Sequence, residues 1–189
     1  MSDVCRELIL GGQKSGKSRR GEELAAAWLG RSRTHRAVLI ATAEAHDDEM
    51  RARIARHRRD RASRVPGLGT VEEPRALAEA VRKHASPNTL VLVDCLTLWL
   101  TNLMMPVDGI AQAPIDVETA ADALVRELRA VTGPVVLIGN EIGLGVIPLG
   151  REVRAFVDAL GMLNQRVAAA CDRVTLMAAG LPLMLKEPE

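Results

Sequence analysis

The chain has 189 residues, of which 48% are hydrophobic and 26% charged, and its net charge is +1. This length and balance suit one globular domain over residues 1–189 and argue against disorder. Neutral charge and an aromatic content of 2% leave little for nucleic-acid binding by charge or base stacking. No stretch has the pattern of a signal peptide or a membrane span, and Cys5, Cys95 and Cys171 lie far apart, so we expect a soluble, cytoplasmic protein with reduced thiols.

Short apolar runs alternate with longer helical patterns along the chain, which is typical of stacked βαβ units. We expect strands at residues 8–10, 37–41, 89–93, 135–138 and 173–177, and a short last strand at 183–185. Helices are expected at residues 18–29, 47–61, 73–83, 96–105, 115–131 and 151–170. The pattern predicts an α/β fold with a mostly parallel sheet of about five to seven strands, flanked by helices.

A phosphate-binding pattern, G-x-x-x-x-G-K-[ST], follows the first expected strand and precedes the first expected helix. Its residues, called the phosphate loop below, are Gly11, Gly12, Gln13, Lys14, Ser15, Gly16, Lys17 and Ser18. In such a loop the backbone N–H groups point at phosphate oxygens, and the helix directs its positive end at the anion. Lys17 would bind the β and γ phosphates, and Ser18 would offer its hydroxyl to Mg²⁺. The pattern therefore predicts a site for GTP or ATP.

An aspartate, Asp94, ends the apolar strand at residues 89–93. A carboxylate at this place in a protein with a phosphate loop is typical of an acid that helps to hold Mg²⁺. The alternative is that Asp94 caps the helix expected from residue 96. We favour the metal role because the phosphate loop is present.

The helix expected at residues 47–61 is strongly basic and contains His57. Such a run is usually a solvated helix face, and a single histidine on it is usually structural. The surrounding arginines also permit a second interpretation. They would disfavour the imidazolium form and keep the ring nucleophilic, and they could bind a triphosphate.

Three further segments have an open interpretation. Residues 140–141 precede a glycine-rich stretch, and we expect either a loop that contacts substrate or a plain turn between strand and helix. Asn164 and Gln165 lie mid-helix and could contact a loop, a neighbouring subunit or substrate. The apolar run at residues 98–100 is expected to lie in the core or in an interface between subunits.

Seven stretches of this sequence resemble the bifunctional adenosylcobinamide kinase/adenosylcobinamide-phosphate guanylyltransferase family of cobalamin synthesis. They cover residues 8–19, 40–43, 47–54 with His57, 70–74, 92–103, 140–148 and 161–166, and so span nearly the whole chain. Together they are far more specific than the phosphate-binding pattern alone.

The resemblance implies two reactions. Such proteins phosphorylate adenosylcobinamide with ATP or GTP, and then attack GTP to form a covalent guanylyl-histidine and pyrophosphate. The GMP then passes to the corrinoid phosphate, which gives adenosylcobinamide-GDP. The resemblance also implies a P-loop NTPase-like (RecA-like) fold that forms a homotrimer, with sites near the subunit interfaces. The nucleophile implied is His57, and the nucleotide-binding positions outside the phosphate loop are Ala41, Thr42, Ala43, Arg58, Arg59, Asp60, Arg61, Glu72 and Asp94.

Two other functions compete with this interpretation. In a simple P-loop kinase, the arginines would clamp the transferred phosphate and His57 would be incidental. In a GTP-binding switch, a strand is usually followed by Asn-Lys-x-Asp for base recognition, and residues 140–143 do not match that pattern. The two alternatives differ from the family interpretation in one respect, because neither forms a covalent bond to GMP.

Overall fold

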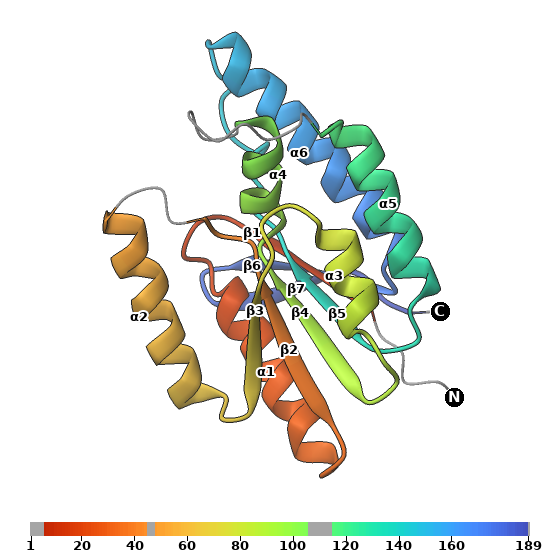
Figure 1. Ribbon diagram of the computed structural model, residues 1–189. Helices are drawn as coiled ribbons and strands as arrows, with labels where there is room; N and C mark the ends of the chain where they lie inside the picture. The colour runs from red at the N-terminus through yellow and green to blue at the C-terminus, as the bar shows by residue number, and fades with distance from the viewer. Residues whose placement is uncertain (1–5, 45–47, 106–114, 189) are drawn as a thin grey trace.

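The structure is a computed structural model that describes residues 6–44, 48–105 and 115–188, without the side chains of residues 49, 50, 53, 54, 57 and 58. Its centre is a seven-stranded sheet in the order β3-β2-β4-β5-β1-β6-β7 (Figure 1). Neighbouring strands are parallel except β7, which pairs antiparallel with β6 at the edge. The strands are β1 (Arg6–Gly11), β2 (Arg36–Ala41), β3 (Leu68–Glu72), β4 (Thr89–Asp94), β5 (Val135–Ile138), β6 (Arg173–Ala178) and β7 (Leu181–Lys186).

Helices cover both faces of the sheet and leave two separate apolar clusters in contact with it. One cluster is built from α3 to α6 and includes Trp99 and Leu124, while the other is built on α1 and includes Trp28. The central strands are buried on both faces, so they are continuous apolar runs rather than alternating ones. The helices are α1 (Lys17–Arg31), α2 (Asp48–Arg64), α3 (Leu77–His84), α4 (Leu96–Met104), α5 (Val117–Ala130) and α6 (Arg151–Ala170).

The expected α/β class and the mostly parallel sheet are confirmed, and the six expected strands and six expected helices are present with small shifts at their ends. The apolar run at residues 98–100 lies in the core, where Trp99 and Leu100 are buried. Cys95 and Cys171 are buried cysteines, while Cys5 lies outside the described residues. Over the described ranges, no helix is both long and apolar enough to cross a membrane.

The structure differs from the sequence analysis in two places between residues 65 and 80. Strand β3 was not predicted, because its partly exposed sequence includes Gly69 and depends on pairing with β2 for its shape. The third helix begins at Leu77 and not at residue 73. Glu73 instead continues the strand end, since its N–H donates to the carbonyl of Ala41 and its carboxylate accepts N–H groups from Arg75 and Ala76.

Candidate nucleotide-binding site

The phosphate loop leaves β1 at the carboxyl edge of the sheet and runs directly into α1. Gly11 has φ 151°, and a Cβ there would lie 2.4 Å from the carbonyl oxygen of Met177, so only glycine fits. The cap of α1 is Gly16 with φ 103°, and a glycine has no side chain to satisfy the N–H groups of the first turn. These N–H groups and the helix dipole form a site for an anion.

Lys17 lies at the start of α1 with only 8% of its surface exposed. Its Nζ donates a hydrogen bond of 2.6 Å to the carbonyl of Gly12, which holds the ammonium over the loop. Burial lowers the pKa of Lys17 below its ordinary value, although Cys95 and Asp94 act in the opposite sense. The structure thus brings the lysine and Asp94 to the same site, as the sequence predicts.

The turn between β6 and β7 supports the loop from outside the pattern. The N–H of Gly180 donates to the carbonyl of Ser15 at 3.0 Å, and both Ala179 and Gly180 have positive φ values. A Cβ on Gly16 would lie 3.3 Å from the Cα of Gly180, so the two segments are in close contact. This support was not predicted, although Gly180 between two apolar runs is a sequence signal for a turn.

Three strand ends lie side by side at the same carboxyl edge of the sheet as the loop. Ala41 at the end of β2 is in register with Glu72 on one side and with Asp94 on the other. Thr42, which follows, is fully buried. Its hydroxyl donates a hydrogen bond to the carbonyl of Cys95 and accepts one from the N–H of Cys95. The Thr42 hydroxyl therefore ties residues 41–43 to the end of β4, and Glu72 remains exposed at this edge.

Asp94 faces the basic helix and does not cap α4, whose N-cap residue is Cys95 without a side-chain hydrogen bond. Its Oδ2 lies 3.5 Å from Nη2 of Arg61. Burial, followed by the negative charge of Asp94, raises the pKa of the Cys95 thiol to about 11, so this thiol is neutral at physiological pH. One hydroxyl from Ser18 and one carboxylate from Asp94 fit Mg²⁺, because that ion keeps several waters and needs few protein ligands.

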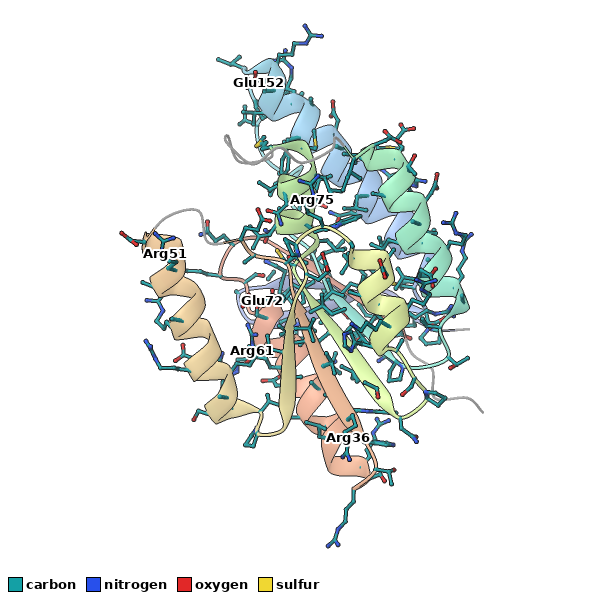
Figure 2. The ribbon with its side chains drawn as sticks, viewed as in Figure 1. Arg36, Arg51, Arg61, Glu72, Arg75 and Glu152 are labelled. Carbon is teal, nitrogen blue, oxygen red and sulfur yellow. The ribbon has the colours of Figure 1, made fainter. Side chains whose placement is uncertain are left out.

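The basic helix α2 contains the residue expected to be the nucleophile. His57 and Arg58 lie within α2, but their side chains are outside the described part of the structure. Arg59 and Asp60 are exposed, whereas Arg61 is buried between α2 and the sheet (Figure 2). A burial of this kind is unusual for an arginine on a basic face and requires a charged partner.

The partner of Arg61, besides Asp94, is a residue that the sequence did not single out. Glu22 on α1 is 4% exposed, and its Oε1 lies 3.7 Å from Nε of Arg61. Arg64 also contacts this carboxylate, with Nε 2.8 Å from Oε2. The only sequence signal is that Glu22 lies one helical turn after Ser18, on the face that includes the buried Ala25.

The glycine-rich stretch at residues 139–150 begins against the phosphate loop. The N–H of Glu141 donates to the carbonyl of Gly11 at 3.0 Å, and the N–H of Asn140 donates to the hydroxyl of Thr97. Asn164 is buried and donates to the carbonyl of Asn140, so its polar contact is with this loop. The loop is therefore fixed at its start, next to the site.

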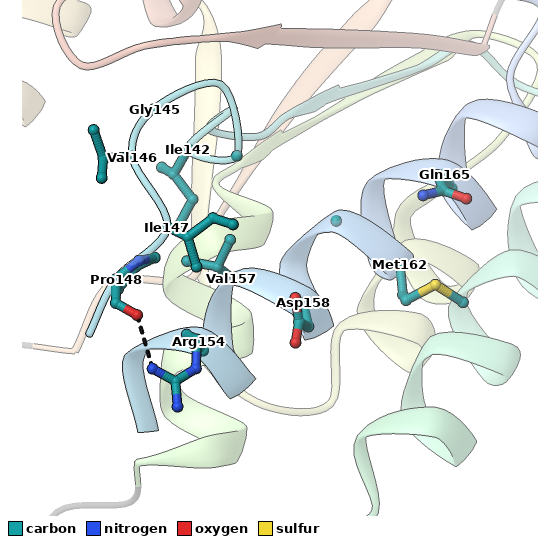
Figure 3. A pocket seen from close by; sticks show the side chains of 12 residues that line it. Ile142, Gly145, Val146, Ile147, Pro148, Arg154, Val157, Asp158, Met162 and Gln165 are labelled. Carbon is teal, nitrogen blue, oxygen red and sulfur yellow. Dashed lines mark hydrogen bonds between the residues drawn. The ribbon is translucent and has the colours of Figure 1, made fainter. Parts of the chain in front are cut away.

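Further along, the same loop and α6 form a groove of about 520 Å³ (Figure 3). Apolar side chains line most of it, and Arg154 closes one end by donating to the carbonyl of Pro148. Val146 and Leu149 are each 97% exposed. Monomeric proteins in water rarely leave several neighbouring apolar side chains this exposed. The exposed apolar residues of this loop are Ile142, Leu144, Val146, Ile147 and Leu149.

The sheet, the phosphate loop and the acid at the end of β4 define a P-loop nucleotide-binding protein of the α/β class. The solved structure of flagellar accessory protein FlaH from Methanocaldococcus jannaschii is similar to this fold, with a TM-score of 0.55 at 12% identity. The match covers 97% of this chain and 79% of the FlaH chain, and it concerns the fold alone.

Residues 7–185 match the family model described as cobinamide kinase / cobinamide phosphate guanyltransferase. The chain is 47% identical over 181 residues to the bifunctional adenosylcobalamin biosynthesis protein CobP of Pseudomonas aeruginosa, with 96% of this chain and 97% of that protein covered. It is 36% identical to the protein CobU of Escherichia coli, a bifunctional adenosylcobalamin biosynthesis protein, with 95% of this chain and 98% of that protein covered. The chain therefore belongs to the cobinamide kinase / cobinamide phosphate guanyltransferase family, and it is an enzyme.

Proposed function

We propose that this enzyme phosphorylates adenosylcobinamide with ATP or GTP, and then transfers GMP from GTP to adenosylcobinamide phosphate. The products of the second step are adenosylcobinamide-GDP and pyrophosphate. The observation that carries the proposal is the contact between Arg61 of α2 and Asp94 of β4. It brings the helix that contains His57 to the edge of the sheet where the phosphate loop lies, and a simple kinase would use the arginines of that helix but not its histidine.

The first reaction uses the phosphate loop. The N–H groups at the start of α1 and the ammonium of Lys17 would bind the β and γ phosphates, while Ser18 and Asp94 would hold Mg²⁺. When bound, Mg²⁺ neutralises negative charge on the phosphate oxygens. The acceptor hydroxyl attacks the γ phosphorus and the bond to the bridging oxygen breaks. A base takes the hydroxyl proton, and Asp94 and Glu141 are the candidates at this edge.

The second reaction uses His57 in two displacements at the α phosphorus of GTP. In the first, an imidazole nitrogen forms a bond to phosphorus, the bond to the β phosphate breaks, and pyrophosphate leaves while the ring proton passes to solvent. In the second, a phosphate oxygen of the acceptor attacks the same phosphorus, and the phosphorus–nitrogen bond breaks. The arginines of α2 at positions 58, 59 and 61 would neutralise the charge that develops on the phosphates.

We also propose that the enzyme is a homotrimer in the cytoplasm. The apolar side chains at residues 142–149 and those of Leu181, Leu183 and Leu185 on β7 are exposed, which supports burial against further copies. The buried cysteines at positions 95 and 171 suit a reducing compartment. Light scattering should give a trimer mass that the double variant Val146→Asp, Leu149→Asp lowers to that of a monomer. A monomeric wild-type protein would exclude the trimer.

The proposed function is tested by identifying the products that are formed from the corrinoid acceptor. The purified chain is incubated with adenosylcobinamide, Mg²⁺ and GTP, and the corrinoid products and pyrophosphate are measured by mass spectrometry and a coupled assay. We expect adenosylcobinamide-GDP with an equal amount of pyrophosphate. Adenosylcobinamide phosphate as the end product would support a simple kinase instead, and slow GTP hydrolysis that ignores the acceptor would support a switch.

A further inference from the structure

Glu22 is a buried carboxylate that belongs neither to the phosphate loop nor to the residues implied in nucleotide binding. It lies on α1 four residues after Ser18, and therefore on the same helix face one turn further from the loop. Burying a carboxylate costs free energy unless charged partners compensate, so its partners indicate what it does.

Both partners come from the last turns of α2. Arg64 approaches the carboxylate with two nitrogens, Nε at 2.8 Å from Oε2 and Nη2 at 3.2 Å from Oε1. Arg61 approaches from the buried side, with Nε at 3.7 Å from Oε1. The carboxylate of Glu22 thus contacts arginines from two consecutive turns of α2.

Arg61 extends this contact to the nucleotide site. Its guanidinium lies between Glu22 and Asp94, with side-chain exposures of 9%, 5% and 21% for Arg61, Glu22 and Asp94. Three elements, α1, α2 and β4, therefore meet at one buried guanidinium. Both carboxylates lie within 3.7 Å of this guanidinium, so both act on its position through their charge.

We propose that Glu22 is a positioning residue for guanylyl transfer, because it fixes the end of α2 against α1 and thereby sets where His57 lies relative to the phosphate loop. The inference rests on the proposed function. His57 precedes Arg61 by four residues, which is about one turn of the same helix. A shift of Arg61 in response to the loss of Glu22 would therefore move His57 with it. The kinase step depends chiefly on Lys17 and Ser18 of the phosphate loop, so it should lose less than guanylyl transfer when Arg61 shifts beside Asp94.

Glu22→Gln tests the inference, since the amide keeps the size of the side chain and removes its charge. The matched control is Glu23→Gln, because Glu23 is the next residue, has a side chain 57% exposed and pairs with Arg19 on the surface. A third variant, Glu22→Asp, keeps the charge and shortens the reach. Each protein is compared with wild type in four measurements: Tm, the Kd for Mg²⁺-GTP, the rate of γ-phosphate transfer to adenosylcobinamide, and the rate at which the α label of GTP binds covalently to the chain.

We expect Glu22→Gln to slow covalent α labelling roughly tenfold or more, since small misplacements of a reacting group have effects of this size. We expect the Kd for GTP and the γ-transfer rate to change several-fold less than the labelling rate, because the phosphate loop is intact and only the contacts of Arg61 are altered. Glu22→Asp should recover part of the labelling rate, and Glu23→Gln should behave as wild type.

Three results would overturn the inference. The first is labelling of Glu22→Gln at the wild-type rate. The second is a parallel loss of Tm, GTP affinity, γ transfer and α labelling, which would make Glu22 a purely structural residue. The third is a wild-type chain that transfers γ phosphate but never retains the α label, and this result would refute the guanylyl-transfer step of the proposed function together with the inference.

Discussion

Strand β1 runs between the amino and carboxyl edges of the sheet, and the charged side chains have different kinds of partner at each edge. At its amino end, Arg6 and Asp172 form hydrogen bonds of 2.8–3.0 Å through backbone and guanidinium nitrogens. The next residue, Glu7, is buried, accepts a hydrogen bond from the hydroxyl of Thr175 and lies 3.5 Å from Arg173. At the carboxyl end, Lys17 donates to a carbonyl, and the N-cap residue of α1 is a glycine.

The difference separates stability from function within one strand. Charges at the amino end are paired with each other, so they stabilise the contact between β1 and β6. Charges at the carboxyl end surround backbone N–H groups that suit phosphate. We therefore expect substitutions at the carboxyl end to change activity more than stability, and substitutions at the amino end to do the reverse.

The largest effect is expected for Lys17→Ala. Loss of the ammonium should lower kcat/KM for phosphoryl transfer by about a thousandfold, or roughly 4 kcal/mol of transition-state stabilisation. The Tm should change little, because the Lys17 charge is already disfavoured by burial, which lowers its pKa. Steady-state kinetics and calorimetry measure both quantities. Lys83→Ala on the exposed end of α3 is the control, and a Lys17→Ala protein with near wild-type kinetics would break the comparison.

A smaller effect, on stability and not on activity, is expected for Asp172→Asn at the amino end of β1. Burial acts to raise the pKa of Asp172, but hydrogen bonds from Arg6 outweigh it and hold the pKa below its usual value. The carboxylate should therefore contribute about 1 kcal/mol to the free energy of unfolding at pH 7, a modest value because the pair is partly exposed. Activity should not change.

The pH dependence of this effect has a definite sign. A lowered pKa in the folded state means that the contribution of Asp172 is complete above its ordinary value of 3.8 and is lost as the pH falls through the folded pKa. Urea unfolding of wild type and Asp172→Asn at several pH values should show two curves that converge below about pH 4. A difference that persists in acid, or a variant with reduced activity, would contradict the division between the two ends.

The last prediction concerns the rate of chemical modification at Cys95. Burial and the charge of Asp94 raise the pKa of this thiol to about 11, so very little thiolate exists at pH 8. We expect a disulfide reagent to modify Cys95 in the folded chain roughly a hundredfold more slowly than in the unfolded chain, as followed by peptide mass mapping. Rapid modification of the folded protein would show that the end of β4 is more open than described.

The sequence was sufficient to predict most of this fold because its signals are local. Apolar runs marked the buried strands β1, β2, β4 and β5, and the phosphate-loop pattern gave the order of strand, loop and helix at the site. Strand β3 lacks such a run, since it lies at the edge of the sheet and its form depends on pairing with β2. Its conformation is therefore set by a long-range contact and not by its own residues.

The candidate site shows the same division between local and long-range information. The positions of Lys17 and Asp94 follow from their place at strand and helix ends. The burial of Arg61 and the role of Glu22 do not, because both depend on how α2 packs against α1. In the sequence, Glu22 is one acid in a helix that also contains Glu23, and only the fold distinguishes the buried carboxylate from the exposed one.

The most direct test of the central claim is to compare GTP labelled on the α phosphate with GTP labelled on the γ phosphate. The chain and the variant His57→Asn are each incubated with Mg²⁺ and labelled GTP and then denatured, and the label bound to protein is counted. We predict that only the α label remains, that the bond is labile in acid and stable in base, and that the variant retains none. Wild-type protein that binds GTP but keeps no α label, or a variant that labels normally, would contradict the account.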